Sequence, residues 1–258
     1  MRKLVGLVPA AGQGKRVSLL PCSKEIFPVG FTVPEGNGDQ QTWPKPISLY
    51  LLERMMLAGV SRVIIVLSRE KWDVVRYYGG GAKYGLDIAY LIQDNVWGMP
   101  YALAVASPWL DDATVLFGMP DTIFSPFDAY ERLLFAHSKT DADLTLGLFP
   151  TATPQRFGMV AYDTSFRMLH TVDKPRQTDL TYMWGIACWG PVFTEFLDHC
   201  VQNRSRDGSE LVLADVFQAA IDSGLDVKVL PFEDGEYLDI GDPDELASAV
   251  LRFAQRAG

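Results

Sequence analysis

Two glycines and several basic residues follow the first apolar segment of the chain. Residues 4–8 lead into the loop Ala10-Ala11-Gly12-Gln13-Gly14-Lys15-Arg16, and Lys24 lies shortly beyond it. Glycines at this spacing allow backbone N–H groups to close around an anion, because no Cβ blocks the approach. The basic side chains supply the charge that a triphosphate requires. The loop therefore predicts a phosphate site, although it matches neither the P-loop nor the Rossmann fingerprint.

Two aspartates, Asp121 and Asp239, are candidates for holding Mg²⁺. Asp121 follows the apolar segment 113–118, which is typical of a buried strand, and Asp239 is flanked by apolar neighbours. Mg²⁺ commonly uses one or two protein carboxylates together with phosphate oxygens. The nearby Asp242 is better interpreted as a helix N-cap, because Pro243 follows it at the first helical position. Taken alone, Asp121 would be an ordinary turn residue.

A third group of residues lies in the second half of the chain. Gly158 falls within a predicted strand, where a glycine permits a ligand to approach the backbone. Asp173 and Lys174 offer an acceptor for sugar hydroxyls and a cation for a phosphate. Taken alone, the sequence Asp-Lys-Pro is an unremarkable turn.

Composition and charge bound the class of protein. The 258 residues carry a net charge of -9, which argues against non-specific binding to nucleic acid. No apolar run is long enough for a membrane span, and the start of the chain lacks the apolar region of a signal peptide. The three cysteines are far apart and odd in number, so they form neither a disulfide framework nor a metal cluster. We expect a cytoplasmic protein with no nucleic-acid or membrane partner.

Apolar segments of strand and helix type alternate through the first half, which predicts parallel βαβ units in a doubly wound sheet. Ligands of such sheets bind beyond the carboxyl ends of the strands. We expect one domain, 1–258. Residues 31–46 are predicted to form a long loop, which suggests a lid or an interface element. The expected strands are 3–8, 62–67, 87–92, 113–118, 144–149, 158–162, 168–172 and 227–232, and the expected helices are 47–58, 71–79, 101–110, 127–138, 211–223 and 243–257.

These motifs occur together in the order found in one family. They are Gly12-Gln13-Gly14-Lys15-Arg16, Lys24 with Pro28-Val29, Lys45-Pro46-Ile47, Gln93 with 98–102, Pro120-Asp121-Thr122, 157–160, Asp173-Lys174-Pro175, 210–216 and 238–242. The chain resembles the sugar nucleotide pyrophosphorylases, nearest to the glucose-1-phosphate thymidylyl- and uridylyltransferases. The resemblance implies a Rossmann-like, three-layer α/β/α fold with a mixed sheet. It also implies a nucleotide-binding half at about 1–125 and a sugar-phosphate-binding half at about 126–258.

The resemblance also implies a role for each residue. Ala10, Ala11, Gly12, Gly14 and Lys15 would contact the nucleotide, Gln93 and Gly98 would read its base, and Arg16 and Lys24 would hold triphosphate oxygens. Asp121 and Asp239 would bind Mg²⁺, while Lys174, Asp173, Gly158 and Trp184 would hold the sugar phosphate. The implied reaction joins a nucleoside triphosphate, with dTTP or UTP favoured, to a sugar 1-phosphate and releases pyrophosphate. Arg16, Lys24, Asp121 and Lys174 are the expected catalytic residues.

Departures from the family pattern leave alternatives open. Thr122 replaces an Asn, Asp173 a Glu and Ala11 a Gly, so the sugar is not specified. The sequence ends soon after the helix expected at Pro243, where many thymidylyltransferases continue into helices used in oligomer contacts, so a monomer or small homo-oligomer is expected. One alternative is a cytidylyltransferase with another phosphate acceptor, which would lack the motifs at 173–175 and 238–241. Another is a non-catalytic nucleotide-sugar-binding regulator, which would have lost the lysines or the aspartates. The three histidines fall outside every motif and are interpreted as structural.

Overall fold

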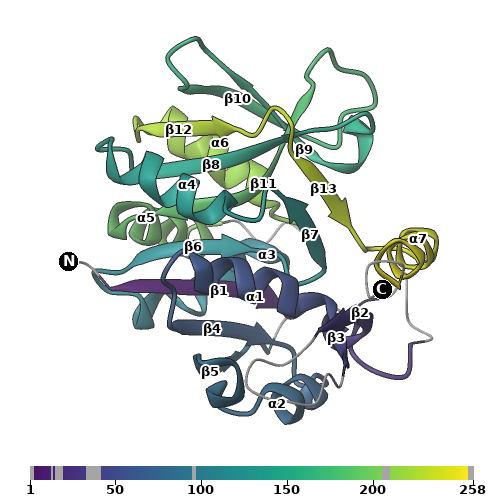
Figure 1. Cartoon of the computed structure of the whole chain (residues 1–258). Helices are drawn as coiled ribbons and strands as arrows, with labels where there is room; N and C mark the ends of the chain where they lie inside the picture. Colours follow the sequence, from purple (N-terminus) through teal and green to yellow (C-terminus); the bar gives the residue numbers. More distant parts are fainter. Residues whose placement is uncertain are drawn as a thin grey trace.

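Parallel strands from the first half of the chain form one side of the central sheet (Figure 1). The computed structural model describes residues 3–12, 14, 20–32, 42–94, 97–204 and 210–254. Within them, β1 lies between β4 and β6, and β5 extends the sheet beyond β4, all in parallel. These segments are near-continuous apolar runs, as expected for strands that are covered on both faces. Their bounds are Leu4–Ala10 (β1), Arg62–Leu67 (β4), Asp87–Ile92 (β5) and Thr114–Gly118 (β6).

The second half adds strands of mixed direction to the same sheet. β11 pairs antiparallel with β6, β8 and β9, and β10 continues beyond β9 as a hairpin partner. β12 pairs in parallel with β8. The bounds are Leu144–Pro150 (β8), Gly158–Tyr162 (β9), Met168–Asp173 (β10), Tyr182–Trp189 (β11) and Val227–Pro231 (β12).

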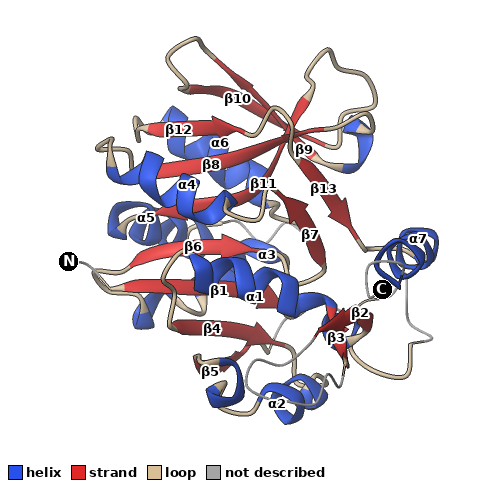
Figure 2. Ribbon diagram, viewed as in Figure 1, coloured by secondary structure: helices blue, strands red, loops and turns tan. Residues whose placement is uncertain are grey.

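Helices cover both faces of this sheet and complete three layers (Figure 2). Alternate residues of the strands point to opposite faces: Leu7 and Phe117 pack with α3, α5 and α6, whereas Val8 and Leu116 pack with α1 and α4. The bounds are Ile47–Leu57 (α1), Trp72–Tyr78 (α2), Met99–Ala104 (α3), Ala129–Ser138 (α4), Pro191–Gln202 (α5) and Leu213–Asp222 (α6).

Two short sheets and the last helix extend the molecule beside the central sheet. β7 (Thr122–Ser125) pairs with β13 (Glu236–Asp239), and β2 (Pro28–Thr32) pairs with β3 (Trp43–Pro46). The helix α7 (Pro243–Ala254) packs on β2 around the apolar side chains Val29, Ile240 and Phe253. Figure 1 shows α7 at the edge of the molecule, next to β2 and β3.

The structure confirms the predicted fold class, a mixed α/β sheet with helices on both faces. It corrects three local predictions. The ends of the loop expected at 31–46 belong to β2 and β3, while 33–41 lie outside the described residues. The helix expected at 101–110 stops at Ala104 and continues as a separate 3-10 turn, Ser107–Trp109. The strand β11 and the helix α5 were not predicted.

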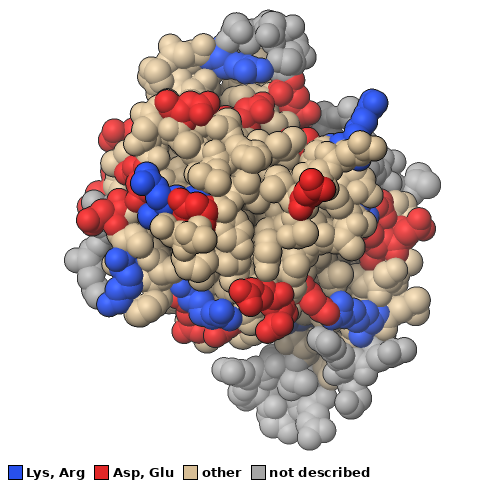
Figure 3. Space-filling model, turned by 90° about the horizontal axis from the view of Figure 1, so that it is seen from above, with Lys and Arg blue, Asp and Glu red and all other residues tan. Residues whose placement is uncertain are grey.

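Acidic and basic side chains are interspersed on the face seen from above (Figure 3). No helix of the described residues is long and apolar enough to cross a membrane.

Candidate active site

A cavity of about 630 Å³ opens where several strands of the central sheet end. It lies beyond the carboxyl ends of β1 and β6, and residues of β9, β10, β11 and β13 complete its wall. This is the edge at which ligands of open α/β sheets bind. The volume is within the range of small-molecule sites, and both predicted halves of the chain contribute to it.

The glycine-rich loop follows β1 directly. Ala11 and Gly12 line the cavity, whereas Ala10 is buried in the core beneath it. Gly14 has a φ of +59°, in the left-handed region that glycine adopts without strain. Among the described residues, a Cβ on Gly12 would meet nothing within 4 Å. Lys15 and Arg16 lie outside the described residues, so their predicted phosphate contacts stay predictions.

Gln93 and Gly98 both line the cavity. Gln93 is buried, and its side-chain Nε2 has no hydrogen-bond partner among the described residues. An amide donor in this state costs free energy unless a ligand or water accepts from it. Gly98 has a φ of +115°, and a Cβ there would lie 2.7 Å from the carbonyl oxygen of Leu211. Only glycine therefore fits at this position.

Lys24 and Asp121 form an ion pair at the cavity. Lys24 begins a short 3-10 helix, Lys24–Ile26, and Asp121 follows β6. Burial lowers the pKa of Lys24, but the carboxylates of Asp121, Glu25 and Asp239 raise it by more, so its pKa lies above the ordinary value. Lys24 therefore carries its charge throughout the physiological range.

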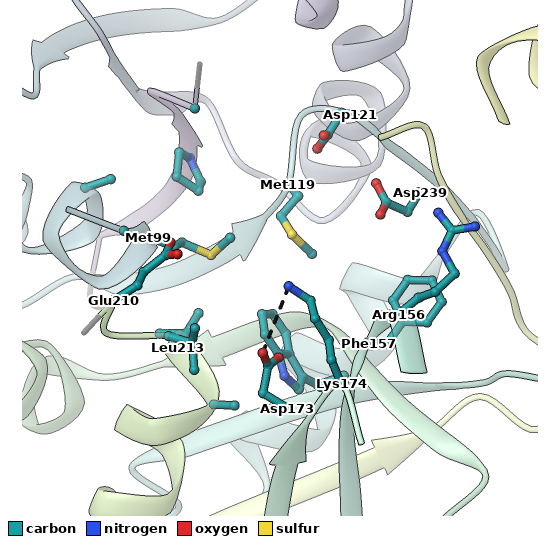
Figure 4. A pocket seen from close by; sticks show the side chains of 18 of the residues that line it. Met99, Met119, Asp121, Arg156, Phe157, Asp173, Lys174, Glu210, Leu213 and Asp239 are labelled. Carbon is teal, nitrogen blue, oxygen red and sulfur yellow. Dashed lines mark ion pairs between the residues drawn. The ribbon is translucent and has the colours of Figure 1, made fainter. Parts of the chain in front are cut away.

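Asp239 lies beside Asp121 because two short strands meet there. Asp239 pairs with Thr122 in the β7–β13 ladder, and the N–H of Ile240 donates to the carbonyl of Asp121 at 2.9 Å. Figure 4 shows both carboxylates on the same side of the cavity. The two carboxylates supply hard oxygen donors. Such donors fit an Mg²⁺ site that is completed by phosphate oxygens. Among the described residues no group of three His, Cys, Asp or Glu side chains gathers as a metal site.

Asp173 and Lys174 face the aspartates from the opposite side of the cavity (Figure 4). Lys174 has a φ of +44°, and its N–H donates to the carbonyl of Phe157 at 2.9 Å. Its Nζ lies 4.0 Å from Asp173 Oδ2, and 62% of its side chain is exposed. A non-glycine residue in this conformation is uncommon and is often found at functional positions. The hairpin β9–β10 thus presents an exposed cation beside a carboxylate.

Gly158 and Trp184 form the floor of this region. Gly158 is paired with Asp173 across the hairpin, and a Cβ on Gly158 would lie 2.2 Å from Trp184 Nε1. The glycine was predicted because a ligand would approach it, but the indole ring already uses that space. Trp184 packs against Phe117 and Phe217, with ring centroids 6.3 Å and 5.2 Å away. The glycine therefore allows a large rigid ring to line the cavity.

Several side chains at the cavity were not predicted from the sequence. Glu25 is buried next to Lys24, and one of its oxygens lies 2.5 Å from the Nζ of Lys71, whereas its Oε2 has no hydrogen-bond partner among the described residues. Burial raises the pKa of Glu25, although Lys71 and Lys24 oppose this. Lys71 has no motif around it, and only the three-dimensional structure brings it to Glu25.

Arg156 also lines the cavity and was not predicted. It pairs with Glu245 and with Asp242, the latter at 3.1 Å, both at the start of α7. The predicted N-cap is present, since the N–H of Glu245 donates to Asp242 Oδ1 at 3.0 Å. This hydrogen bond, together with Arg156, holds the pKa of Asp242 below its usual value. Arg156 therefore joins the cavity wall to the last helix.

Glu210 points into the cavity near Met99 (Figure 4). It opens the motif 210–216, to which sequence reasoning gave no role, and its exposure leaves it accessible to a ligand. None of the three histidines lines the cavity.

Comparisons with known proteins identify relatives of this chain. The nucleotidyl transferase family model matches residues 5–256. A glucose-1-phosphate thymidylyltransferase of Neisseria gonorrhoeae is 25% identical over 251 residues, which cover 95% of this chain and 81% of the relative. One from Streptomyces antibioticus is 30% identical over 76% of this chain and 54% of the relative. A mannose-1-phosphate guanylyltransferase of Mycobacterium tuberculosis is 29% identical over 78% of this chain and 54% of the relative.

A solved structure has the same fold. It is that of a Bacillus anthracis protein named as a glucose-1-phosphate thymidylyltransferase, in complex with a sucrose, and it superposes with a TM-score of 0.83 at 18% identity. The match covers 97% of this chain and 95% of that one. Because the family model matches nearly the whole length, this chain belongs to the nucleotidyl transferase family and is a nucleotidyltransferase.

Proposed function

We propose that this chain transfers a nucleotidyl group from a nucleoside triphosphate to a sugar 1-phosphate, giving an NDP-sugar and pyrophosphate. dTTP or UTP is the favoured donor, in keeping with the named activity of several relatives. The observation that carries the proposal is one cavity with two kinds of polar group. Gln93, Gly98, Asp173 and Lys174 all line it. In this proposal Gln93 and Gly98 would contact the nucleotide base, and Asp173 and Lys174 would bind the sugar phosphate.

The proposed chemistry requires no general base. The attacking oxygen of a sugar 1-phosphate is already ionised at neutral pH, so the protein must position it and neutralise the charge that develops on the α-phosphate. Lys174 would draw in the sugar phosphate, and its exposed side chain can reach it. Lys24, and Arg16 from the loop, would hold the triphosphate oxygens in line with the attack. Asp173 and the wall formed by Gly158 and Trp184 would orient the sugar.

A divalent cation would be held by Asp121 and Asp239. When bound, Mg²⁺ would supply positive charge to the α-phosphate region and help orient the triphosphate. The remaining tasks belong to side chains of the protein. We further propose that 1–258 acts as one domain, in which residues before about 125 bind the nucleotide and those after it bind the sugar phosphate.

A pyrophosphate-release screen tests the proposal. The purified chain would be mixed with Mg²⁺, one of dTTP, UTP, CTP, GTP or ATP, and one of several hexose 1-phosphates. We expect release with at least one pair, and with dTTP or UTP most rapidly. GTP is included because one relative is named for guanylyl transfer.

Two other outcomes would assign a different function. A preference for CTP, with an acceptor other than a sugar 1-phosphate, would indicate a cytidylyltransferase and contradict the role of Gln93. No release with any pair, together with tight binding of an NDP-sugar in calorimetry, would indicate a regulatory binding protein. Lys24, Asp121 and Asp239 are all present at the cavity, which argues against a regulatory binding protein.

A further inference from the structure

The Lys24 ammonium lies where the two aspartates of the cavity converge. Its Nζ is paired with Asp121 Oδ2, and the Asp239 carboxylate is close enough to act on it electrostatically. Only 19% of the Lys24 side chain and 14% of the Asp121 side chain is exposed, so water screens the pair weakly. One residue proposed to hold the triphosphate is thus already engaged with one proposed to hold a metal.

The residues on both sides of Lys24 are held by hydrogen bonds. The N–H and hydroxyl of Ser23 donate to Asp73 at 2.6 and 2.7 Å, and the Ser48 hydroxyl donates to the Glu25 carbonyl at 2.6 Å. Because the short helix is held in this way, a change of partner at Lys24 requires rotation of its long side chain only. Rotamer changes of this kind need no movement of the fold.

We propose that Lys24 is a resident counter-ion that competes with a divalent cation for Asp121 until the nucleotide arrives. The proposal rests on the proposed function, because the triphosphate is what attracts Lys24 away from Asp121. Divalent metal and nucleotide then bind cooperatively, since each favours the same exchange of partners. Without nucleotide, the wild-type site holds a free divalent cation poorly.

Titration of Mn²⁺ into the nucleotide-free protein, followed by calorimetry or by the EPR signal of free Mn²⁺, tests this. Lys24→Met removes the competing charge and keeps most of the apolar length of the side chain. We expect it to bind Mn²⁺ about tenfold more tightly than wild type, or more, while losing affinity for dTTP. Mn²⁺ should accordingly raise the Tm of Lys24→Met more than that of wild type. Lys24→Gln serves if the Met variant does not fold.

Lys174→Met is the matched control, because Lys174 lies in the same cavity but pairs with Asp173. It should leave Mn²⁺ affinity near the wild-type value, and adding Asp121→Asn to Lys24→Met should remove the gain. Equal or weaker Mn²⁺ binding by Lys24→Met would overturn the proposal. So would a gain that survives Asp121→Asn, or an equal gain in Lys174→Met. The Mn²⁺ titrations use no substrate, so their results are independent of whether the pyrophosphate screen succeeds.

Discussion

At the scale of single residues, the glycines of the cavity wall serve two different purposes. Gly98 and Gly158 are required by protein packing, because a Cβ would collide with Leu211 and with Trp184 respectively. Gly12 lines the cavity, and no atom of the described residues lies within 4 Å of where its Cβ would be, so the lack of a side chain there leaves room for a ligand. The charged residues also differ, since Lys24 and Asp121 are paired while most of Lys174 is exposed.

Asp121→Asn is expected to lower kcat by about 10³ or more. The change removes one carboxylate charge with almost no change in volume, so Mg²⁺ is held less tightly. Charge that develops at the α-phosphate is then less well neutralised. Steady-state kinetics of pyrophosphate release measures the effect, and circular dichroism checks that the fold is retained. Asp94→Asn, at an exposed carboxylate paired with Arg69, is the control and should keep wild-type turnover. Full activity of Asp121→Asn would show that the metal assignment is wrong.

Gly158→Ala is expected to lower the free energy of unfolding by about 1–3 kcal/mol. The added methyl group would overlap Trp184 Nε1, and the surrounding core leaves the ring little space to move. Urea denaturation measures the loss. Gly80→Ala, where a Cβ meets nothing within 4 Å, should change stability by less than about 0.5 kcal/mol. A Gly158→Ala protein as stable as wild type would contradict the packing described for Trp184.

At the scale of elements, positions in the cavity depend on contacts between segments that are distant in sequence. The short helix Lys24–Ile26 is held by Asp73 and Lys71 from the start of α2 and by Ser48 of α1. No periodicity or motif signals such contacts, so sequence reasoning identified Lys24 but neither Glu25 nor Lys71. The buried parallel strands and the β9–β10 hairpin were predictable because their apolar runs are bounded by turn residues. β11 has a comparable apolar run, but its aromatic and glycine-containing sequence was not recognised as a strand.

Lys71→Met is expected to lower the free energy of unfolding by about 3–5 kcal/mol at pH 7, because it leaves the buried Glu25 carboxylate without its counter-ion. Burial already raises the pKa of Glu25, and Lys71 is the main group opposing that rise. In the variant, Glu25 therefore binds its proton in the folded state at a higher pH than in the unfolded chain. The stability that protonation contributes is present at low pH and is lost as pH rises through the folded pKa.

Urea denaturation at pH 7 and pH 5 checks this prediction. The deficit of Lys71→Met relative to wild type should be smaller at pH 5, where more Glu25 is neutral. The double variant Glu25→Gln/Lys71→Met should recover part of the loss, since no buried charge remains. A deficit that is the same at both pH values, and unchanged in the double variant, would mean that Lys71 stabilises the fold by packing alone.

At the scale of the whole molecule, the mixed sheet brings the two halves of the chain to one cavity. β11 pairs with β6 of the first half and with β8 and β9 of the second, so it fixes their relative positions. The sequence motifs identified most of the residues at the cavity because they follow strands whose ends share an edge. They missed Arg156, whose partners lie at the start of α7, because an arginine at the end of a short 3-10 helix has no signal of its own.

In the proposed function, groups of one cavity join a sugar 1-phosphate to the α-phosphate of a nucleotide. Its most direct test uses a sugar 1-phosphate that carries ¹⁸O in its three non-bridging phosphate oxygens, together with dTTP or UTP and Mg²⁺. Mass spectrometry of the products should find all three labelled oxygens in the NDP-sugar, one of them bridging the two phosphorus atoms, and unlabelled pyrophosphate. Label in the pyrophosphate, or turnover of the triphosphate without any NDP-sugar, would contradict attack of the sugar phosphate on the α-phosphate.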